Sequence, residues 1–352
     1  MALSVDIEKK LGGFNLVSRF NAGEETLAIL GASGCGKSMT LKCIAGVETP
    51  DKGRIVLDDT VLFDSEKKIN VPARLRKTGY LFQNYALFPN MTVEQNIACG
   101  IRKSKKEKAE IVKEKITAFY LNDLEKQYPC QLSGGQQQRV AIARLLASEP
   151  RLIMFDEPLS ALDSFLKWEL EQEILRVKEN FHGSILFVSH SRDEVYRLCD
   201  RIVAMDHGKT QDTAGKKDFF TNPQSLTAAM LSGCKNISRA KKTGEYSLFM
   251  TDWNTLLITA TPIPDDLQYV GFRAHFFEVV ESLDEENTVE CIVTRVIEDV
   301  FSIIVMTQVK GGNPENSRSY IRYELDKDKW ESLGNPKRLY LRMPKEKLIL
   351  LR

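Results

Sequence analysis

The chain has 352 residues, of which 43% are hydrophobic and 28% are charged, and its formal net charge at pH 7 is +1. This length allows two globular domains, and the balanced charge gives no indication of nucleic acid or acidic lipid as a partner. No apolar run approaches the roughly 20 residues that span a bilayer, and residues 1–10 are too polar and too mixed in charge for a signal peptide.

The first motif along the chain is a predicted phosphate-binding loop at residues 31–38, which match the pattern G-x-x-x-x-G-K-[ST]. The apolar run 26–30 is a predicted strand that enters this loop, and residues 38–45 form a predicted helix whose N-terminus faces the phosphates. Lys37 is expected to reach the β- and γ-phosphates, and the Ser38 hydroxyl is expected to bind Mg²⁺. The predicted nucleotide-binding residues here are Gly31, Ser33, Gly34, Cys35, Gly36, Lys37, Ser38 and Met39.

The seven cysteines are scattered along the chain without a C-x-x-C pair. This pattern favours reduced thiols over a disulfide framework or a zinc site. Cys35 lies inside the predicted phosphate-binding loop, where it is interpreted as a small residue that fills space at a variable position. Because a helix N-terminus lowers the pKa of a thiol, Cys35 is expected to be sensitive to thiol reagents.

Short apolar runs at residues 56–57, 79–82, 152–155, 185–188 and 202–205 are predicted strands that alternate with helical stretches. This alternation predicts an α/β core with a parallel sheet. Residues 84–150 are polar and helix-rich, and they form a predicted helical subdomain inserted between two sheet strands. The charge run at residues 101–108 is interpreted as the solvated start of a helix, because glutamates are interspersed among its lysines.

A second phosphate-binding surface is predicted at residues 132–136, Leu-Ser-Gly-Gly-Gln. These residues precede a run with apolar residues at helical spacing. Ser133 is a natural N-cap, and the two glycines expose N–H groups at the positive end of the helix. The predicted binding residues of this segment are Ser133, Gly134, Gly135 and Gln136.

Two adjacent carboxylates, Asp156 and Glu157, end the apolar run 152–155, which suits a buried parallel strand. Asp156 at the end of the strand is expected to hold Mg²⁺ directly or through water. Glu157 is expected to orient and deprotonate the water that attacks the γ-phosphate.

These three motifs, in this order, resemble the nucleotide-binding subunit of an ATP-binding-cassette (ABC) transporter, a P-loop NTPase. The resemblance implies a head-to-tail homodimer, in which residues 132–136 of one subunit close on the ATP bound by the phosphate loop of the other. It implies that Gln83 contacts Mg²⁺ or the attacking water, and that His190 contacts the γ-phosphate and holds Glu157. It also implies that Asp163 lies near the nucleotide.

Phe14 occupies the place where the family has an aromatic residue against adenine, although Phe14 could equally be a core residue. The family also receives a helix of an integral membrane permease on the surface that corresponds to residues 83–100. The resemblance therefore implies ATP and Mg²⁺ as cofactors, permease subunits as partners, and an indirect link to a substrate-binding protein. It places the chain at the cytoplasmic face of the membrane, with no nucleic acid as a partner.

Residues 1–233 form the expected cassette, and residues 234–352 form an expected β-rich domain with a regulatory or subunit-contact role. Strands are predicted at 246–250, 256–260, 289–296, 302–309, 320–325 and 339–342, with turns at 311–314 and 334–336. Many short strands suggest a small β-barrel. Residues 271–275 resemble an arginine-containing strand of the oligomer-binding-fold domains that are appended to importer ATPases.

Residues 7–16 and 53–64 resemble molybdate importer ATPases, so molybdate is the expected cargo. Sulfate, polyamine, iron(III) and sugar importers share this layout and remain alternatives, because the ATPase never touches the cargo. A soluble ABC ATPase that acts on DNA or ribosomes usually carries two cassettes or a coiled-coil insertion, and neither is visible. A P-loop phosphotransferase would have no use for residues 132–136.

Overall fold

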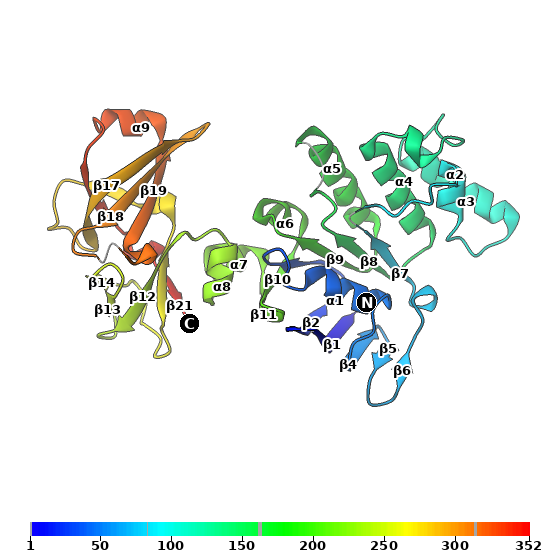
Figure 1. Cartoon of the computed structure of the whole chain (residues 1–352), viewed down its shortest axis with the longest axis horizontal. Coiled ribbons are helices and arrows are strands. Elements are labelled where there is room, and N and C mark those ends of the chain that lie inside the picture. The colour runs from blue at the N-terminus through cyan, green and yellow to red at the C-terminus, as the bar shows by residue number, and fades with distance from the viewer. Residues whose placement is uncertain (1, 83, 161–163, 313–314) are drawn as a thin grey trace. The chain divides into compact units, whose positions relative to one another are not determined.

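The computed structural model of the chain describes residues 2–82, 84–160, 164–312 and 315–352. It consists of two compact units, Met1–Lys216 and Lys217–Arg352, which Figure 1 shows in blue to green and in green to red. The sequence predicted a domain boundary after residue 233. In the structure the second unit begins at Lys217, so residues 217–233 belong to it. Within the described ranges, no helix is both long enough and apolar enough to cross a membrane.

The first unit is built on one sheet of eleven strands in the order β6-β5-β4-β1-β2-β11-β10-β3-β9-β8-β7. The strands are β1 (Leu3–Leu11), β2 (Phe14–Ala22), β3 (Thr26–Leu30), β4 (Lys52–Leu57), β5 (Thr60–Asp64), β6 (Ile69–Asn70), β7 (Thr78–Leu81), β8 (Leu152–Asp156), β9 (Ser184–Ser189), β10 (Arg201–Asp206) and β11 (Lys209–Gly215). The predicted strands at 79–82, 152–155, 185–188 and 202–205 are thereby confirmed within one residue at each end, and the predicted strand at 56–57 is the end of the longer β4.

The sheet is mixed, whereas the sequence predicted a parallel one. Strands β10, β3, β9, β8 and β7 pair with one another in parallel, as expected, whereas β10 pairs with β11 in antiparallel fashion. Strands β1, β2, β4, β5 and β6 pair with one another in antiparallel fashion, and short turns connect the successive pairs such as β1 and β2. Strand β2 also pairs with β11, in parallel. The parallel half carries the motifs, since β3 leads into the phosphate loop and β8 ends in Asp156.

The helices of the first unit are α1 (Lys37–Ala45), α2 (Val93–Ala98), α3 (Lys105–Ala118), α4 (Gly134–Ala147), α5 (Ser164–Asn180) and α6 (Arg192–Leu198). Helices α2, α3 and α4 lie together between β7 and β8 in the chain and form the expected helical insertion (Figure 1). Ser104 caps α3 through a capping box with Glu107. The charge run therefore forms the mostly exposed first turns of a helix, as predicted.

The second unit contains two five-stranded sheets, in the orders β14-β13-β12-β15-β21 and β16-β20-β17-β18-β19. Their strands are β12 (Asn236–Lys242), β13 (Ser247–Met250), β14 (Thr255–Ile258), β15 (Tyr269–Phe272), β16 (Glu278–Val280), β17 (Thr288–Glu298), β18 (Ser302–Val309), β19 (Tyr320–Asp326), β20 (Arg338–Arg342) and β21 (Ile349–Leu351). The helices α7 (Lys216–Thr221), α8 (Leu226–Leu231) and α9 (Lys327–Ser332) accompany them. All six strands predicted for this region are confirmed.

The two sheets of the second unit enclose one apolar core, which includes the fully buried Trp253 and Phe272. The amide of Asn236 on β12 links them, because it donates to the backbone oxygen of Arg322 and accepts from its backbone nitrogen. Figure 1 shows β12–β14 and β17–β19 as two separate groups of strands. The described strands thus form two sheets around a core, and the likeness to an oligomer-binding fold remains a prediction.

Candidate active site

The predicted phosphate loop connects the fully buried strand β3 to α1. Gly34 and Gly36 adopt φ values of 79° and 110°, which favour glycine. A Cβ atom on Gly36 would lie 2.8 Å from Cδ1 of Leu16 and 3.3 Å from Cζ of Phe14. Nothing lies within 4 Å of a Cβ placed on Gly34, and Ser33 is exposed. The loop therefore presents an open backbone surface of the kind that receives phosphate.

Lys37 starts α1, and its side chain folds back along the loop. Its Nζ donates hydrogen bonds of 2.9 Å to the carbonyl oxygens of Gly31 and Ala32. The same Nζ lies 3.5 Å from Oε1 of Glu157, and only 3% of the Lys37 side chain is exposed. A buried ammonium group thus stands at the loop, where it can meet an anionic ligand.

Asp156, at the end of β8, accepts one hydrogen bond on each carboxylate oxygen. The Ser38 hydroxyl donates to Oδ1 over 2.7 Å, and the Tyr80 hydroxyl donates to Oδ2 over 2.7 Å. Burial, and then the hydrogen bond to Asp156, raise the pKa of Tyr80, so its hydroxyl remains a donor. A hydroxyl and a carboxylate are oxygen ligands that Mg²⁺ accepts, so this pair fits the predicted metal site.

Ser38 and Asp156 provide only two side chains as ligands for a metal ion. Among the residues that the structure describes, no three histidine, cysteine, aspartate or glutamate side chains gather in a way that could hold a metal ion. A magnesium ion here would therefore need oxygen ligands from water or from a bound phosphate in addition, which is how Mg²⁺ is bound in many nucleotide sites.

Glu157 follows β8 and lies between Lys37 and His190. Its Oε2 is 3.4 Å from Nδ1 of His190, which directly follows β9. Its backbone nitrogen donates to the carbonyl oxygen of Val188 on that strand over 3.0 Å. Glu157 has a positive φ of 47°, an uncommon backbone conformation for a residue with a side chain and one that recurs at functional sites.

Residues 133–136 form the beginning of α4. Ser133 is the N-cap, its Oγ accepts from the backbone nitrogen of Gln136, and Oε1 of Gln136 accepts from the backbone nitrogen of Ser133. Ser133 and Gly134 are exposed, and nothing lies within 4 Å of a Cβ placed on Gly134. Within the described ranges, no hydrogen bond or ion pair joins this segment to residues 31–38. The structure thus gathers Lys37, Ser38, Asp156, Glu157 and His190, and the helix start stands apart.

The other predicted residues of the phosphate loop lie as follows. Phe14 and Met39 are half-buried against the core cluster of the first unit. Cys35 is buried, and this burial raises the pKa of its thiol although Lys37 acts in the opposite direction. The expectation of a lowered pKa at Cys35 was therefore wrong, because burial outweighs the helix N-terminus. The predicted residues Gln83 and Asp163 lie outside the described residues.

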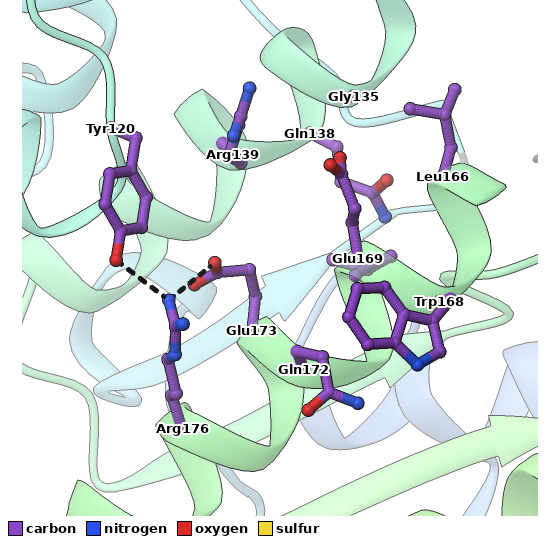
Figure 2. A pocket seen from close by; sticks show the side chains of 11 residues that line it. Tyr120, Gly135, Gln138, Arg139, Leu166, Trp168, Glu169, Gln172, Glu173 and Arg176 are labelled. Carbon is purple, nitrogen blue, oxygen red and sulfur yellow. Dashed lines mark hydrogen bonds and ion pairs between the residues drawn. The ribbon is translucent and has the colours of Figure 1, made fainter.

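A cavity of about 280 Å³ lies between α4 and α5, with Gly135 and Arg139 on one side (Figure 2). Across it, the Arg176 guanidinium lies 3.0 Å from a Glu173 carboxylate oxygen and 3.4 Å from the Tyr120 hydroxyl, as the dashed lines show. The sequence did not predict this cavity. Among the described residues that line it, Glu173 and Arg176 pair with each other, and the residues that surround Lys37 in the described structure are not among them.

Comparisons of the sequence with known proteins show which family the chain resembles. A model described as ABC transporter matches residues 15–160, which include the phosphate loop, the segment 132–136 and the acidic pair. The spermidine/putrescine import ATP-binding protein PotA of Vibrio cholerae is 39% identical over 240 residues, or 67% of this chain. This alignment spans 61% of that relative, which is less than two thirds of its length.

A second relative matches almost from end to end, and a solved structure matches the cassette. The sulfate/thiosulfate import ATP-binding protein CysA of Halalkalibacterium halodurans is 32% identical over 363 residues, covering 97% of this chain and 98% of that protein. The dimeric ATP-binding cassette MJ0796, solved in a post-hydrolysis state with ADP and Pi, is 27% identical with a TM-score of 0.52. The match covers 61% of this chain and 99% of the MJ0796 chain. The chain therefore belongs to the ABC transporter family, as one of the ATP-binding proteins that hydrolyse ATP.

Proposed function

We propose that the chain is the ATP-hydrolysing subunit of an importer, which couples ATP binding and hydrolysis to transport through permease subunits. The observation that carries this proposal is the gathering of Lys37, Ser38, Asp156 and Glu157 at the ends of β3 and β8. Two relatives that are named as import ATP-binding proteins support the direction of transport.

ATP fits the phosphate loop through the residues that the sequence predicted, Gly31–Gly36 for the backbone contacts and Lys37 for the β- and γ-phosphates. Lys37 would exchange the carbonyl oxygens of Gly31 and Ala32 for phosphate oxygens. Phe14 lies next to Gly36 and would provide a face for the adenine ring. Mg²⁺, held by Ser38 and Asp156, would neutralise phosphate charge when it is bound.

Hydrolysis requires a base that accepts a proton from water, and Glu157 is the carboxylate placed to do so. In the described structure its two oxygens lie near Lys37 and His190. Once phosphate oxygens take over Lys37, Oε1 of Glu157 becomes available to the attacking water, while His190 continues to orient Oε2. We retain Gln83 as a further contact to the water or to Mg²⁺, and Asp163 as a residue near the nucleotide.

The exposed start of α4 has the features of a phosphate-binding surface, but within the described part of the chain no hydrogen bond or ion pair joins it to the phosphate loop. We therefore infer a head-to-tail homodimer, in which Ser133–Gln136 of one subunit contact the ATP held by the other. The dimeric form of the MJ0796 cassette supports a dimer. The heterodimer experiment described in the Discussion tests it.

Residues 83–100 are the proposed docking surface for an integral permease subunit, which places the chain at the cytoplasmic face of the membrane. Phe88 and Met91 in this segment are exposed at 47% and 36%, and the Arg144 guanidinium lies over the Phe88 ring. Exposed apolar side chains of this kind suit a protein contact. Co-purification of the tagged chain with membrane subunits tests this assignment. Substitution of Phe88 should reduce the amount of membrane subunit that co-purifies.

For the cargo, we propose an oxyanion of the sulfate class, because the relative that aligns over 97% of this chain is named for sulfate and thiosulfate. A polyamine is the second candidate, because the Vibrio cholerae relative is 39% identical and named for spermidine and putrescine. Neither relative supports molybdate, which residues 7–16 and 53–64 had favoured. Uptake of labelled sulfate, molybdate and spermidine in a deletion strain, with and without the chain, separates the three. The second unit remains assigned to regulation or subunit contact.

A further inference from the structure

We propose that Tyr80 is a positioning residue of the magnesium site, whose hydroxyl fixes the orientation of the Asp156 carboxylate. This inference rests on the proposed function of Ser38 and Asp156 in holding Mg²⁺. The sequence assigned no role to Tyr80, which precedes the predicted glutamine loop by three positions.

The pairing of β7 and β8 brings the two side chains together. The strands are parallel, with Tyr80 opposite Met154 and Leu81 opposite Phe155, so Asp156 follows two positions beyond the partner of Tyr80. The long phenol bridges this offset and donates to Oδ2 of Asp156 over 2.7 Å. Because the ring is partly buried against the core and its centroid lies 4.1 Å from that of Phe82, the direction of the hydroxyl is restricted.

The two hydrogen bonds on Asp156 differ in what binding of the metal does to them. Ser38 donates to Oδ1, but a Ser38 oxygen that binds Mg²⁺ must direct a lone pair at the metal. The hydroxyl keeps its proton and can still donate, but its direction then depends on the position of the metal, so this hydrogen bond cannot orient Asp156 independently of the metal. Tyr80 has no predicted contact with phosphate or metal, so its bond to Oδ2 can persist and keep Oδ1 aimed at the site.

Loss of this bond has a predictable consequence for metal binding. Asp156 is only 6% exposed, so water does not readily replace a missing donor at Oδ2. The carboxylate would then spend part of its time rotated away from the position next to Ser38. Residues that orient metal ligands typically change metal affinity by about 10- to 100-fold when they are replaced. A Tyr80→Phe variant keeps the ring and removes only the hydroxyl.

The test measures metal affinity directly, with Mn²⁺ as a paramagnetic substitute for Mg²⁺. We would titrate Mn²⁺ into the full-length chain with saturating ATP and follow free Mn²⁺ by electron paramagnetic resonance. Tyr80→Phe is expected to weaken Mn²⁺ binding by about tenfold or more. ATP affinity in the presence of EDTA and the thermal midpoint without nucleotide are expected to stay close to those of the wild type.

Tyr323→Phe is the matched control. Tyr323 is a buried tyrosine of the second unit, and among the described residues its hydroxyl has no hydrogen-bond partner. It should leave the Mn²⁺ affinity unchanged. Equal Mn²⁺ affinity of wild type and Tyr80→Phe would overturn the proposal. A parallel loss of metal-free ATP binding and of thermal stability would also overturn it, because Tyr80 would then be a packing residue. If the wild type itself binds no Mn²⁺ with ATP, the proposed magnesium site fails and this inference fails with it.

Discussion

The ammonium group of Lys37 and the carboxylate of Glu157 lie 3.5 Å apart, with 3% and 18% of their side chains exposed. The residue expected to bind phosphate and the residue expected to activate water therefore partly neutralise each other in this structure. A polyphosphate that occupies the loop would compete with Glu157 for Lys37. ATP binding and the activation of Glu157 as a base are thus linked through the contact between Lys37 and Glu157.

Glu157→Gln is expected to preserve ATP binding and to lower the turnover number by about 10²- to 10⁴-fold, because it keeps the shape and removes the base. Since the variant also lacks the charge that pairs with Lys37, its ATP affinity should equal or exceed that of the wild type. An ATP-bound dimer should accumulate. Phosphate release and size-exclusion chromatography with ATP measure these effects, and the exposed carboxylate Glu179 provides a control as Glu179→Gln. Wild-type turnover in Glu157→Gln would contradict the assignment of the base.

Lys37→Ala is expected to weaken ATP binding by on the order of 10- to 100-fold, because a hydrogen-bonding charge that faces the β- and γ-phosphates is removed. Lys42→Ala, a change on the same helix, should leave the affinity unchanged. Equilibrium binding of a fluorescent ATP analogue measures both. Unchanged affinity in Lys37→Ala would count against the phosphate-loop assignment.

The thiol of Cys35 is expected to react slowly with maleimide in the folded chain. Its raised pKa leaves less thiolate at neutral pH than an ordinary cysteine has, and the side chain is buried. Labelling should quicken as the pH rises toward that pKa, and also when the chain is unfolded in urea. Exposed Cys130 provides the internal comparison. Peptide mass spectrometry after brief labelling at pH 7 should find Cys130 modified well before Cys35, and the reverse order would show that burial does not control the thiol.

The sequence predicted best what depends on neighbours in the chain. The strand 26–30, the loop and the helix that follows are contiguous, so their order could be inferred from one short segment. The contact of Ser38 with Asp156 could be anticipated as well, because the loop before Ser38 leaves the end of β3, Asp156 ends β8, and the ends of parallel strands meet at one edge of the sheet. The N-cap role of Ser133 followed from local capping chemistry.

The sequence predicted less well what depends on how distant segments pack. The antiparallel half of the sheet escaped prediction, because only one of the predicted strands, 56–57, lies in it, and the alternation of strands with helices favoured parallel pairing. Tyr80 was missed because its hydroxyl reaches Asp156 on a neighbouring strand, 76 residues further along the chain. The pKa of Cys35 depends on burial by segments such as β10, whose Met205 lies near the loop. Local charge alone could not reveal it.

The inferred sandwich of two chains can be tested by complementation between two inactive variants. Each composite site needs Lys37 from one subunit and Ser133 from the other, so homodimers of Lys37→Ala and of Ser133→Arg have two impaired sites each. In a heterodimer of the two, one site carries both lesions and the other carries neither. We expect purified heterodimers, isolated through two different tags, to bind ATP at one site and to recover part of the ATPase activity. Recovery below half of the wild-type rate would still agree with cooperation between sites. Heterodimers that bind no ATP would show that Ser133–Gln136 do not act on the nucleotide of the opposite subunit.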